Sequence, residues 1–361
     1  MKNPLTFLFK RRPRFNWSLL PVVLVAVLFL TSTLLLFWYS TKSVEKLVVD
    51  QLKSQLLVLA RSGSHAIGDF LEDRESEIFL LRENEAVKAI DEKEGLAYFG
   101  LMSKHLEEKH DPFAGLVRAD NEGRVVWSAS GGVAEKVQDG VILADRDYFL
   151  WAKDQPLSGK TYMSGPLLSR GGTSEGRQIL TLSTPVFYEN YFNGVVFASF
   201  LLDEVVSEYV VPLLVSPETI VSIISRREGK IIASTESDKI GLSFENCANY
   251  TPDNLENLQK TILGGREGAL VHDCWLYGEL GETKKLITAF VPLGMDNNAD
   301  WVITVSLPYE KVLNLIRPID ANIHAQLTIG LLGFLIVCFC FVVWLRISER
   351  RAFINGFSHR R

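Results

Sequence analysis

The sequence predicts an α+β protein in which a long N-terminal helix leads into two successive antiparallel sheets, with a membrane-spanning helix on either side. Three observations support this prediction. Two uncharged apolar runs lie near the ends of the 361-residue chain, a helical pattern of apolar residues follows the first run, and an internal repeat recurs after 106 to 107 residues. Helices packed beside an antiparallel sheet make an α+β layer architecture.

The two apolar runs predict transmembrane helices at 18–39 and 326–345. Residues 18–39 carry no charged side chain, and neither do residues 327–345. At a rise of 1.5 Å per residue, each run can cross a hydrocarbon core of about 30 Å. The alternatives are a cleaved signal peptide and a buried core helix. The first run is longer than a signal peptide requires and no small-residue cleavage site follows it.

Charge predicts how these helices are oriented. Residues 1–17 have a net charge of +5 and residues 346–361 of +4, so a total of −5 leaves −14 for the segment between them. Basic flanks stay on the cytoplasmic side. We therefore expect a two-pass protein of the inner (plasma) membrane, with both tails cytoplasmic and a periplasmic or extracellular domain. An acidic outer domain argues against nucleic acid and anionic lipid as partners.

The four cysteines divide between two environments. Cys338 and Cys340 lie in the second apolar run and are expected to be small apolar residues there. Cys247 and Cys274 lie in the outer segment, where disulfides persist, and are expected to pair; two free buried thiols are the alternative. The six histidines follow no ligand spacing, so neither a metal nor another cofactor is expected.

A long amphipathic helix is expected over residues 40–90. Apolar residues recur there at steps of three to four, and Gly63 and Gly68 are its weak points. A short helix followed by a loop is the alternative, but no proline occurs between residues 22 and 111 to force a break. The apolar positions are Val44, Val48, Leu52, Leu56, Leu59, Ile67, Phe70, Ile78 and Leu81.

The internal repeat predicts two similar halves, at 91–212 and 213–325. "NEGRVVWSAS" at 121–130 returns as "REGKIIASTE" at 227–236, and "ILTLSTPVF" at 179–187 as "LITAFVPLG" at 286–294. A repeat of this length indicates a duplicated domain rather than a solenoid. Each copy predicts a hairpin, with strands at 114–119 and 124–129 and then at 219–225 and 230–234, followed by a loop-and-helix excursion and two further β-rich runs.

Together these features resemble the double Cache domain, the extracytoplasmic ligand-sensing module of bacterial chemoreceptors, sensor kinases and cyclases. "DRDYF" at 145–149, "SGP" at 164–166 and "NGVVFASFLLDEV" at 193–205 resemble the membrane-distal signature of that family, and "DWVITVSLP" at 300–308 the membrane-proximal one. The resemblance implies two PAS-like sheets, with a small ligand bound in the distal half.

The resemblance also implies the site residues. It places DRDYF in a helix that lines the distal pocket, where the planar guanidinium of Arg146 suits a carboxylate. A surface pair with Asp145 or Asp147 is the alternative for Arg146, and ordinary core packing for the aromatic residues. The full set of expected ligand-binding residues is Arg146, Tyr148, Tyr162, Trp127, Ser183 and Ser199.

Amino-acid-sensing members of the family carry a tyrosine and two aspartates further along the chain. In this sequence those positions fall near Leu167, Ser169 and Ser199, and all three differ. The carboxylates that hold an α-ammonium are therefore missing. The expected ligand is a simple carboxylate or a neutral metabolite.

The final residues leave the output open. Residues 346–361 form the second tail, and "FINGFSH" at 353–359 weakly resembles the start of a histidine-kinase phosphoacceptor box, with His359 as a possible remnant. An arginine-rich cytoplasmic anchor is the alternative. We expect no catalytic domain in this chain. The favoured function is a homodimeric sensor with a cytoplasmic signalling partner, such as a two-component histidine kinase system; the alternative is a membrane-anchored binding or scaffold protein without an output.

Overall fold

The computed structural model describes residues 20–109, 112–138, 140–155, 160–243, 260–274, 283–293 and 301–358. The chain divides into two compact units. One comprises Met1–Asp50 and Lys311–Arg361, and the other comprises Gln51–Glu310.

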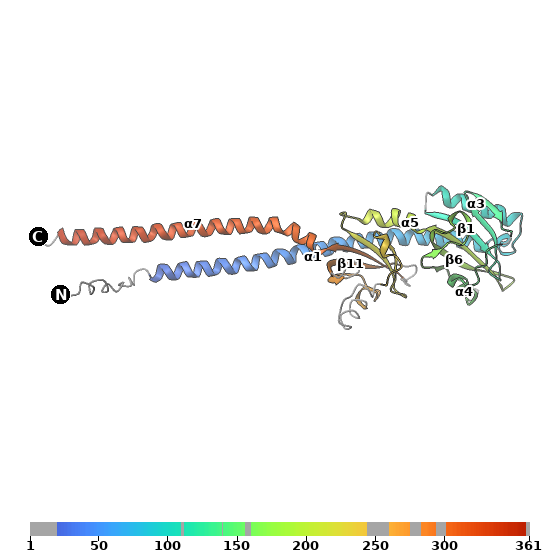
Figure 1. The fold of residues 1–361 in the computed structure, drawn as a ribbon, viewed down its shortest axis with the longest axis horizontal. Helices are drawn as coiled ribbons and strands as arrows, with labels where there is room; N and C mark the ends of the chain where they lie inside the picture. Colours follow the sequence, from blue (N-terminus) through green and yellow to red (C-terminus); the bar gives the residue numbers. More distant parts are fainter. Residues whose placement is uncertain are drawn as a thin grey trace, which may run out of the picture. The chain divides into compact units, whose positions relative to one another are not determined.

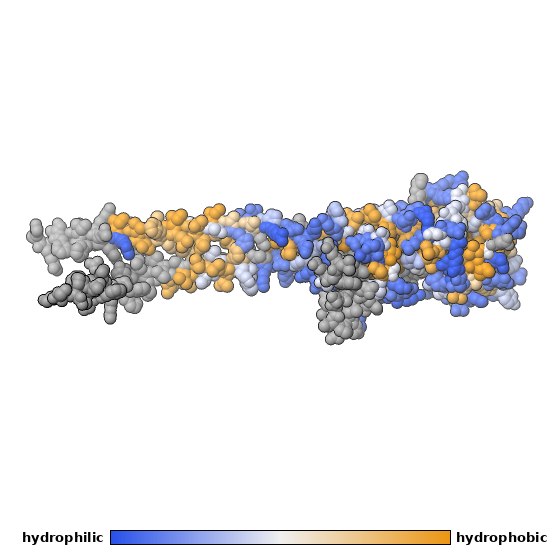
Figure 2. Space-filling model, viewed as in Figure 1, coloured by the Kyte–Doolittle hydropathy of each residue, from blue (hydrophilic) through white to orange (hydrophobic). Residues whose placement is uncertain are grey.

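The first unit contains the apolar lengths of two helices, α1 (Leu20–Glu83) and α7 (Tyr309–Ser358) (Figure 1). Both helices are long and apolar enough to cross a membrane, as judged by length and composition. Hydrophobic residues cover these lengths, and side chains such as Leu35 and Phe339 are about two-thirds exposed (Figure 2). Phe29 stacks on Phe334 with ring centroids 3.8 Å apart.

Within the second unit, α1 buries one face of its apolar pattern. Leu56, Ile67, Ile78 and Leu81 are at most 1% exposed. Gly63 lies at a close approach, because a Cβ atom added there would lie 2.4 Å from Leu213 Cδ1 and 2.9 Å from Ile303 Cδ1. The glycine that was expected to weaken the helix is thus a position of close packing.

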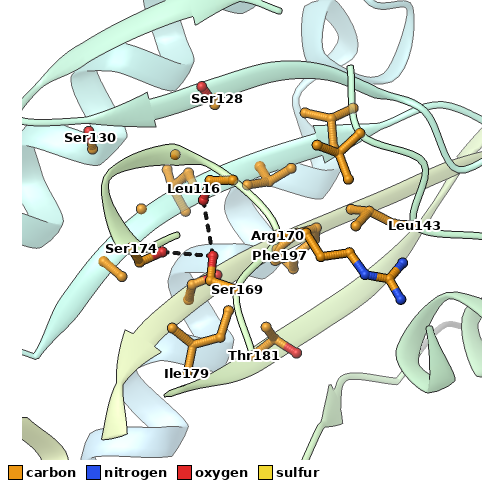
Figure 3. A pocket seen from close by; sticks show the side chains of 18 of the residues that line it. Leu116, Ser128, Ser130, Leu143, Ser169, Arg170, Ser174, Ile179, Thr181 and Phe197 are labelled. Atoms are coloured by element: carbon orange, nitrogen blue, oxygen red, sulfur yellow. Dashed lines mark hydrogen bonds between the residues drawn. The ribbon is translucent and has the colours of Figure 1, made fainter. Parts of the chain in front are cut away.

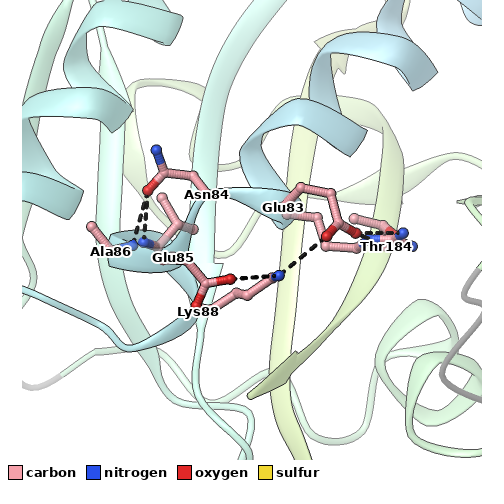
Figure 4. Close-up of polar contacts among 8 residues, drawn as sticks. Glu83, Asn84, Glu85, Ala86, Lys88 and Thr184 are labelled. Atoms are coloured by element: carbon pink, nitrogen blue, oxygen red, sulfur yellow. Dashed lines mark hydrogen bonds and ion pairs between the residues drawn. The ribbon is translucent and has the colours of Figure 1, made fainter. Parts of the chain in front are cut away.

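The helix α1 ends at Glu83, seven residues before the predicted boundary, because Asn84 takes an extended conformation and caps the next helix. The Asn84 side chain accepts hydrogen bonds from the amides of Ala86 and Val87 at 3.0 and 3.2 Å, which favours the start of a new helix there (Figure 4). Two helices follow, α2 (Glu85–Lys88) and α3 (Glu94–Glu108).

The first sheet has the strand order β3-β2-β1-β7-β6-β4, with β5 also paired to β6, and every pairing in it is antiparallel. Helix α3 packs on one face and α4 (Asp147–Lys153) lies on the other (Figure 1). The strands are β1 (Phe113–Ala119), β2 (Val125–Ser130), β3 (Val133–Lys136), β4 (Tyr162–Met163), β5 (Leu167–Leu168), β6 (Gln178–Tyr188) and β7 (Tyr191–Leu201).

The second sheet repeats this arrangement with the order β10-β11-β12-β8-β9, again antiparallel. Strands β9, β8, β12 and β11 adjoin one another in the same sequence as β2, β1, β7 and β6. The order of pairing is therefore duplicated along with the sequence motifs. The strands are β8 (Ile220–Ser225), β9 (Ile231–Ser234), β10 (Gly268–Cys274), β11 (Lys284–Leu293) and β12 (Trp301–Pro308).

Short helical segments join the two sheets. Helix α5 (Leu202–Val205) follows β7 directly and continues as a π turn at Val206–Val210 and a 3₁₀ turn at Val211–Leu213. Two further 3₁₀ turns, η2 (Gly172–Ser174) and η5 (Ser237–Lys239), lie in loops. The predicted fold class, a long N-terminal helix with two antiparallel sheets and two apolar helices, is confirmed.

Candidate functional site

A cavity of about 400 Å³ lies on the α4 side of the first sheet. Its floor comes from β1, β2, β6 and β7, and its cover comes from α4 and the loop that carries η2 (Figure 3). The volume falls in the range of small-molecule sites. Apolar lining residues include Val117, Val125, Leu143, Ile179 and Phe197; polar ones include Ser128, Glu135, Arg146, Ser169, Arg170, Thr181 and Ser199.

Arg146 offers the cavity an unused donor. It is the residue that precedes α4, in an extended conformation, and its Nη2 donates to the carbonyl oxygen of Leu168 at 2.8 Å. Its Nε is buried and has no hydrogen-bond partner among the described residues. A buried donor left unpaired is costly, so an acceptor in the cavity would be favoured next to it.

The neighbouring cation, Arg170, is already paired. Its guanidinium contacts the Asp145 carboxylate through two hydrogen bonds of 2.6 Å. Hydrogen bonding by Arg170 lowers the pKa of Asp145 to about 2. This pair joins the turn before α4 to the loop after β5. Of the two arginines, Arg146 is the better placed to bind an added anion.

Tyr148 forms part of the wall, at 3% exposure, and its ring lies 5.1 Å from that of Phe197. Burial raises the pKa of its hydroxyl well above the usual value, so Tyr148 stays neutral at physiological pH. Its partner Phe197 lies on β7 in the floor of the cavity. The aromatic residues of DRDYF therefore pack on the sheet and shape the wall.

Leu167, Ser169 and Ser199, the positions where amino-acid-sensing relatives carry a tyrosine and two aspartates, all line this cavity. Ser169 Oγ lies 3.0 Å from Ser174 Oγ in the covering loop (Figure 3). These three positions of the cavity wall therefore carry no carboxylate.

Three expected site residues lie elsewhere. Trp127 points to the opposite face of the sheet and packs against Phe99 of α3, with ring centroids 5.9 Å apart. Ser183 is buried beside β4 and donates to the carbonyl oxygen of Tyr162 at 3.4 Å. The structure thus groups Arg146, Tyr148 and Ser199 around the cavity and leaves Trp127, Ser183 and Tyr162 outside its lining.

Tyr162 lines a separate cavity of about 410 Å³ between the two sheets, together with Asp147, Arg227 and Trp301. Its hydroxyl donates to Asp147 Oδ2 at 3.0 Å. Burial, with the nearby charge of Asp147, raises the pKa of Tyr162 to about 12.

Two charged lining residues, Glu135 and Arg170, were not among the expected site residues. Glu135 lies on the edge strand β3, and Arg170 follows β5. The four residues of β3, Val133–Lys136, show no alternation of apolar and polar residues, and which face of the strand meets the cavity depends on its pairing with β2.

The remaining sequence-based expectations concern the cysteines and the tail. Cys274 is buried and disulfide-bonded, whereas Cys338 and Cys340 are free. The expected partner Cys247 lies outside the described residues, so that pairing stays a prediction. His359 also lies outside the described residues.

Comparison with known proteins identifies similar domains. The family model dCache_1, described as "Cache domain", matches residues 40–316. No curated protein matches the chain.

Similar folds occur among solved structures. The ligand-binding domain of the Pseudomonas fluorescens chemoreceptor CtaA in complex with L-isoleucine is 15% identical, with a TM-score of 0.53 over 76% of this chain and 98% of that one. The extracellular domain of the designated histidine kinase rpHK1S-Z16 is 18% identical, with a TM-score of 0.53 over 73% and 97%.

An extracellular ligand-binding receptor from Desulfohalobium retbaense is 14% identical, with a TM-score of 0.51 over 70% of this chain. The chain spans 40% of that receptor's length.

Proposed function

The chain belongs to the Cache domain family, and from this premise we propose that it is an extracytoplasmic sensor. The cavity on the α4 side of the first sheet, called the distal cavity from here on, binds a small carboxylate through Arg146. The observation that carries the proposal is the buried, unpartnered Nε of Arg146 in the cavity wall. A guanidinium held by one hydrogen bond to Leu168 keeps its fork oriented for a carboxylate.

The ligand class follows from the charges that line the cavity. Leu167, Ser169 and Ser199 offer no carboxylate to an α-ammonium, whereas Arg146 offers a cation. The CtaA domain was solved with L-isoleucine. In this chain we propose a carboxylate without an α-amino group in place of such a ligand.

The experiment is a thermal-shift screen of small carboxylates and amines on the full chain in detergent micelles. Carboxylates are expected to raise the melting temperature of the parent, and Arg146→Ala to lose those shifts. Arg177→Ala is the matched control, because Arg177 is about half exposed and does not line the cavity. Its Nη2 pairs with Asp203 Oδ2 at 2.8 Å. Hits confined to amines without a carboxylate, or full retention of shifts by Arg146→Ala, would contradict the proposal.

We further propose a two-pass anchor in the plasma membrane, with both tails cytoplasmic and the acidic unit outside. The two apolar helices and the basic residues that flank them support this topology. A membrane-impermeant thiol reagent applied to intact cells tests it. The variant Ser54→Cys, exposed on α1, is expected to be labelled, whereas Ser43→Cys in a position nearer the membrane is expected to react more slowly.

The proposed output is a cytoplasmic signalling partner of the two-component type, reached through a homodimer. Helix α1 runs without a break from Leu20 to Glu83 and so joins the first apolar length to the second unit. Strand β12 of the second sheet leads directly into α7, which carries the second apolar length. A ligand shifts such a system only through its different affinity for two states. Driving a switch from mostly off to mostly on takes a difference of about 5.5 kcal/mol between the ligand's binding free energies for the two states. One hydrogen bond from Arg146 supplies only part of that difference.

A further inference from the structure

The distal cavity has chemically different ends. Arg170, whose side chain comes from the loop after β5, lies on one side of the cavity with Leu143, and Ser128 and Ser130 lie on the other (Figure 3). Arg146 is joined to the first side through Leu168, the residue two positions before Arg170. We call these the arginine end and the serine end.

Glu135 belongs to the serine end. On β3, Ala134 approaches Gly100 of α3 and Lys136 pairs with Glu92, which precedes α3. Strand alternation therefore turns Glu135 to the opposite face, toward the cavity. Glu135 Oε1 accepts a hydrogen bond from Ser128 Oγ at 3.5 Å, and no described cation lies within ion-pair distance of this carboxylate.

The sheet register separates Glu135 from the aromatic wall. Glu135 is opposite Ser128, which is opposite Val117, which in turn is opposite Phe197. Three strand spacings correspond to about 14 Å along the sheet. The ring of Tyr148 packs against that of Phe197 in a tilted arrangement, at the far end of this row.

The surface between these ends is apolar. Val117 and Phe197 lie in the row itself, and Ile179 lies further along β6. An α-amino acid carries its ammonium and carboxylate groups on the same carbon, so this pair of groups cannot span the row from Glu135 to the aromatic wall. A linear ligand with a carboxylate at one terminus and a cation at the other would match the arginine end and the serine end of the cavity. Its carbon chain would cover the apolar surface between them.

Building on the proposed carboxylate site at Arg146, we propose that the ligand is an ω-amino carboxylate or a similar dipolar chain, whose distal cation is bound by Glu135. Glu135 would then replace, at a different place in the fold, the aspartates absent at the Ser169 and Ser199 positions. Edge strands also carry charges that prevent sheet-to-sheet aggregation, and the experiment separates that role from ligand binding.

The experiment compares three probes on the full chain in detergent micelles by isothermal titration calorimetry. They are hexanoate, 6-aminohexanoate and norleucine, the last two being isomers that differ in where the amino group sits. We expect 6-aminohexanoate to bind about tenfold more tightly than hexanoate. One partly exposed charge-assisted hydrogen bond between its ammonium group and Glu135 accounts for a difference of that size.

The variants assign this difference to a residue. Glu135→Gln is expected to remove the tenfold preference for 6-aminohexanoate over hexanoate. Glu122→Gln, an exposed glutamate in the β1–β2 turn, makes the same change in net charge and is expected to keep the preference. Arg146→Ala is expected to weaken both ligands.

Three results would overturn the inference. Norleucine binding more tightly than 6-aminohexanoate would place the ammonium beside the carboxylate. Equal binding of hexanoate and 6-aminohexanoate, or a preference that survives Glu135→Gln, would remove Glu135 from the site and leave the carboxylate site at Arg146 intact. If none of the probes bound and none of a wider set of carboxylates did, the proposed function itself would fail.

Discussion

Arg82, in the last turn of α1, lies with its Nη1 3.4 Å from the Oγ1 of Thr184 on β6. Both residues are buried, and Thr184 is on the strand whose Ile179 and Thr181 line the cavity. The helix that leads from the apolar unit is thereby fixed to a strand of the proposed ligand site. The same helix end is held by Lys88, whose Nζ lies 3.1 Å from Glu83 (Figure 4).

Replacing Arg82 with alanine should destabilise the second unit, Gln51–Glu310. The change removes buried hydrogen bonds, and the hydroxyl of Thr184 loses the donor that Arg82 supplies. We therefore expect a loss of about 1–3 kcal/mol in the free energy of unfolding. Arg61→Ala is the matched control, since the Arg61–Glu267 pair, with Nε 2.8 Å from Oε2, is nearly half exposed on the same helix. Urea unfolding followed by circular dichroism measures both. An equal loss in the two variants would show that the Thr184 contact is not the stabilising one.

Two glycines of α1 should respond to alanine in opposite directions. At Gly63 a Cβ would clash with Leu213 and Ile303, so Gly63→Ala should cost about 1–3 kcal/mol of stability. At Gly68 no atom lies within 4 Å of an added Cβ, so Gly68→Ala should stabilise the helix by up to about 1 kcal/mol. Thermal melting of the two variants beside the parent tests the pair, and melting shifts of the same sign would contradict the packing described for Gly63.

Much of the fold could be predicted because burial repeats with the period of each element. Leu56, Ile67 and Ile78 were placed on one helix face by their spacing, and they are buried. The hairpins β1–β2 and β8–β9 lie within a residue or so of their predicted positions. Their turns need a left-handed residue, and Gly123 and Gly229 have φ values of +80° and +66°.

The site was less predictable because a strand's alternation does not say which face meets a cavity. Trp127 reads as a wall residue in sequence, but its register opposite Arg118 and Lys136 turns it toward α3. The irregular register after Arg118 changes which residues of β2 face the cavity, so Val125 lines it too. Glu135 was missed for the same reason. Arg146 and Tyr148 were found through family resemblance rather than through any period.

The stability of the second sheet should depend on pH through His272 on β10. Burial lowers the pKa of His272, whose Nε2 lies 2.8 Å from Thr288 Oγ1 and whose Nδ1 lies 3.2 Å from the Asp273 carbonyl oxygen. A lowered folded pKa means that the unfolded chain binds the proton more readily. Stability is then fully present above the unfolded value of about 6.5 and is lost as pH falls below it toward the folded pKa.

We therefore expect the urea midpoint of the parent to fall between pH 7.5 and pH 5.5. His272→Gln should show a smaller fall, because glutamine does not titrate. His65→Gln, at an exposed position of α1, is the control and should keep the parent's dependence. Identical pH dependence in the parent and in His272→Gln would show that other groups cause it.

The final prediction is a disulfide between Cys247 and Cys274. Cys274 is disulfide-bonded and 0% exposed at the end of β10, while Cys338 and Cys340 are free in α7. A bridge to Cys247 would close a loop of modest length and stabilise the fold by about 3–4 kcal/mol on the chain-entropy model. Non-reducing peptide mapping of protein exported to an oxidising compartment should recover the two cysteines in one linked peptide. Cys247→Ser should then leave Cys274 reactive toward thiol reagents after unfolding and lower the melting temperature. Recovery of both cysteines as free thiols from the exported parent would rule the bridge out.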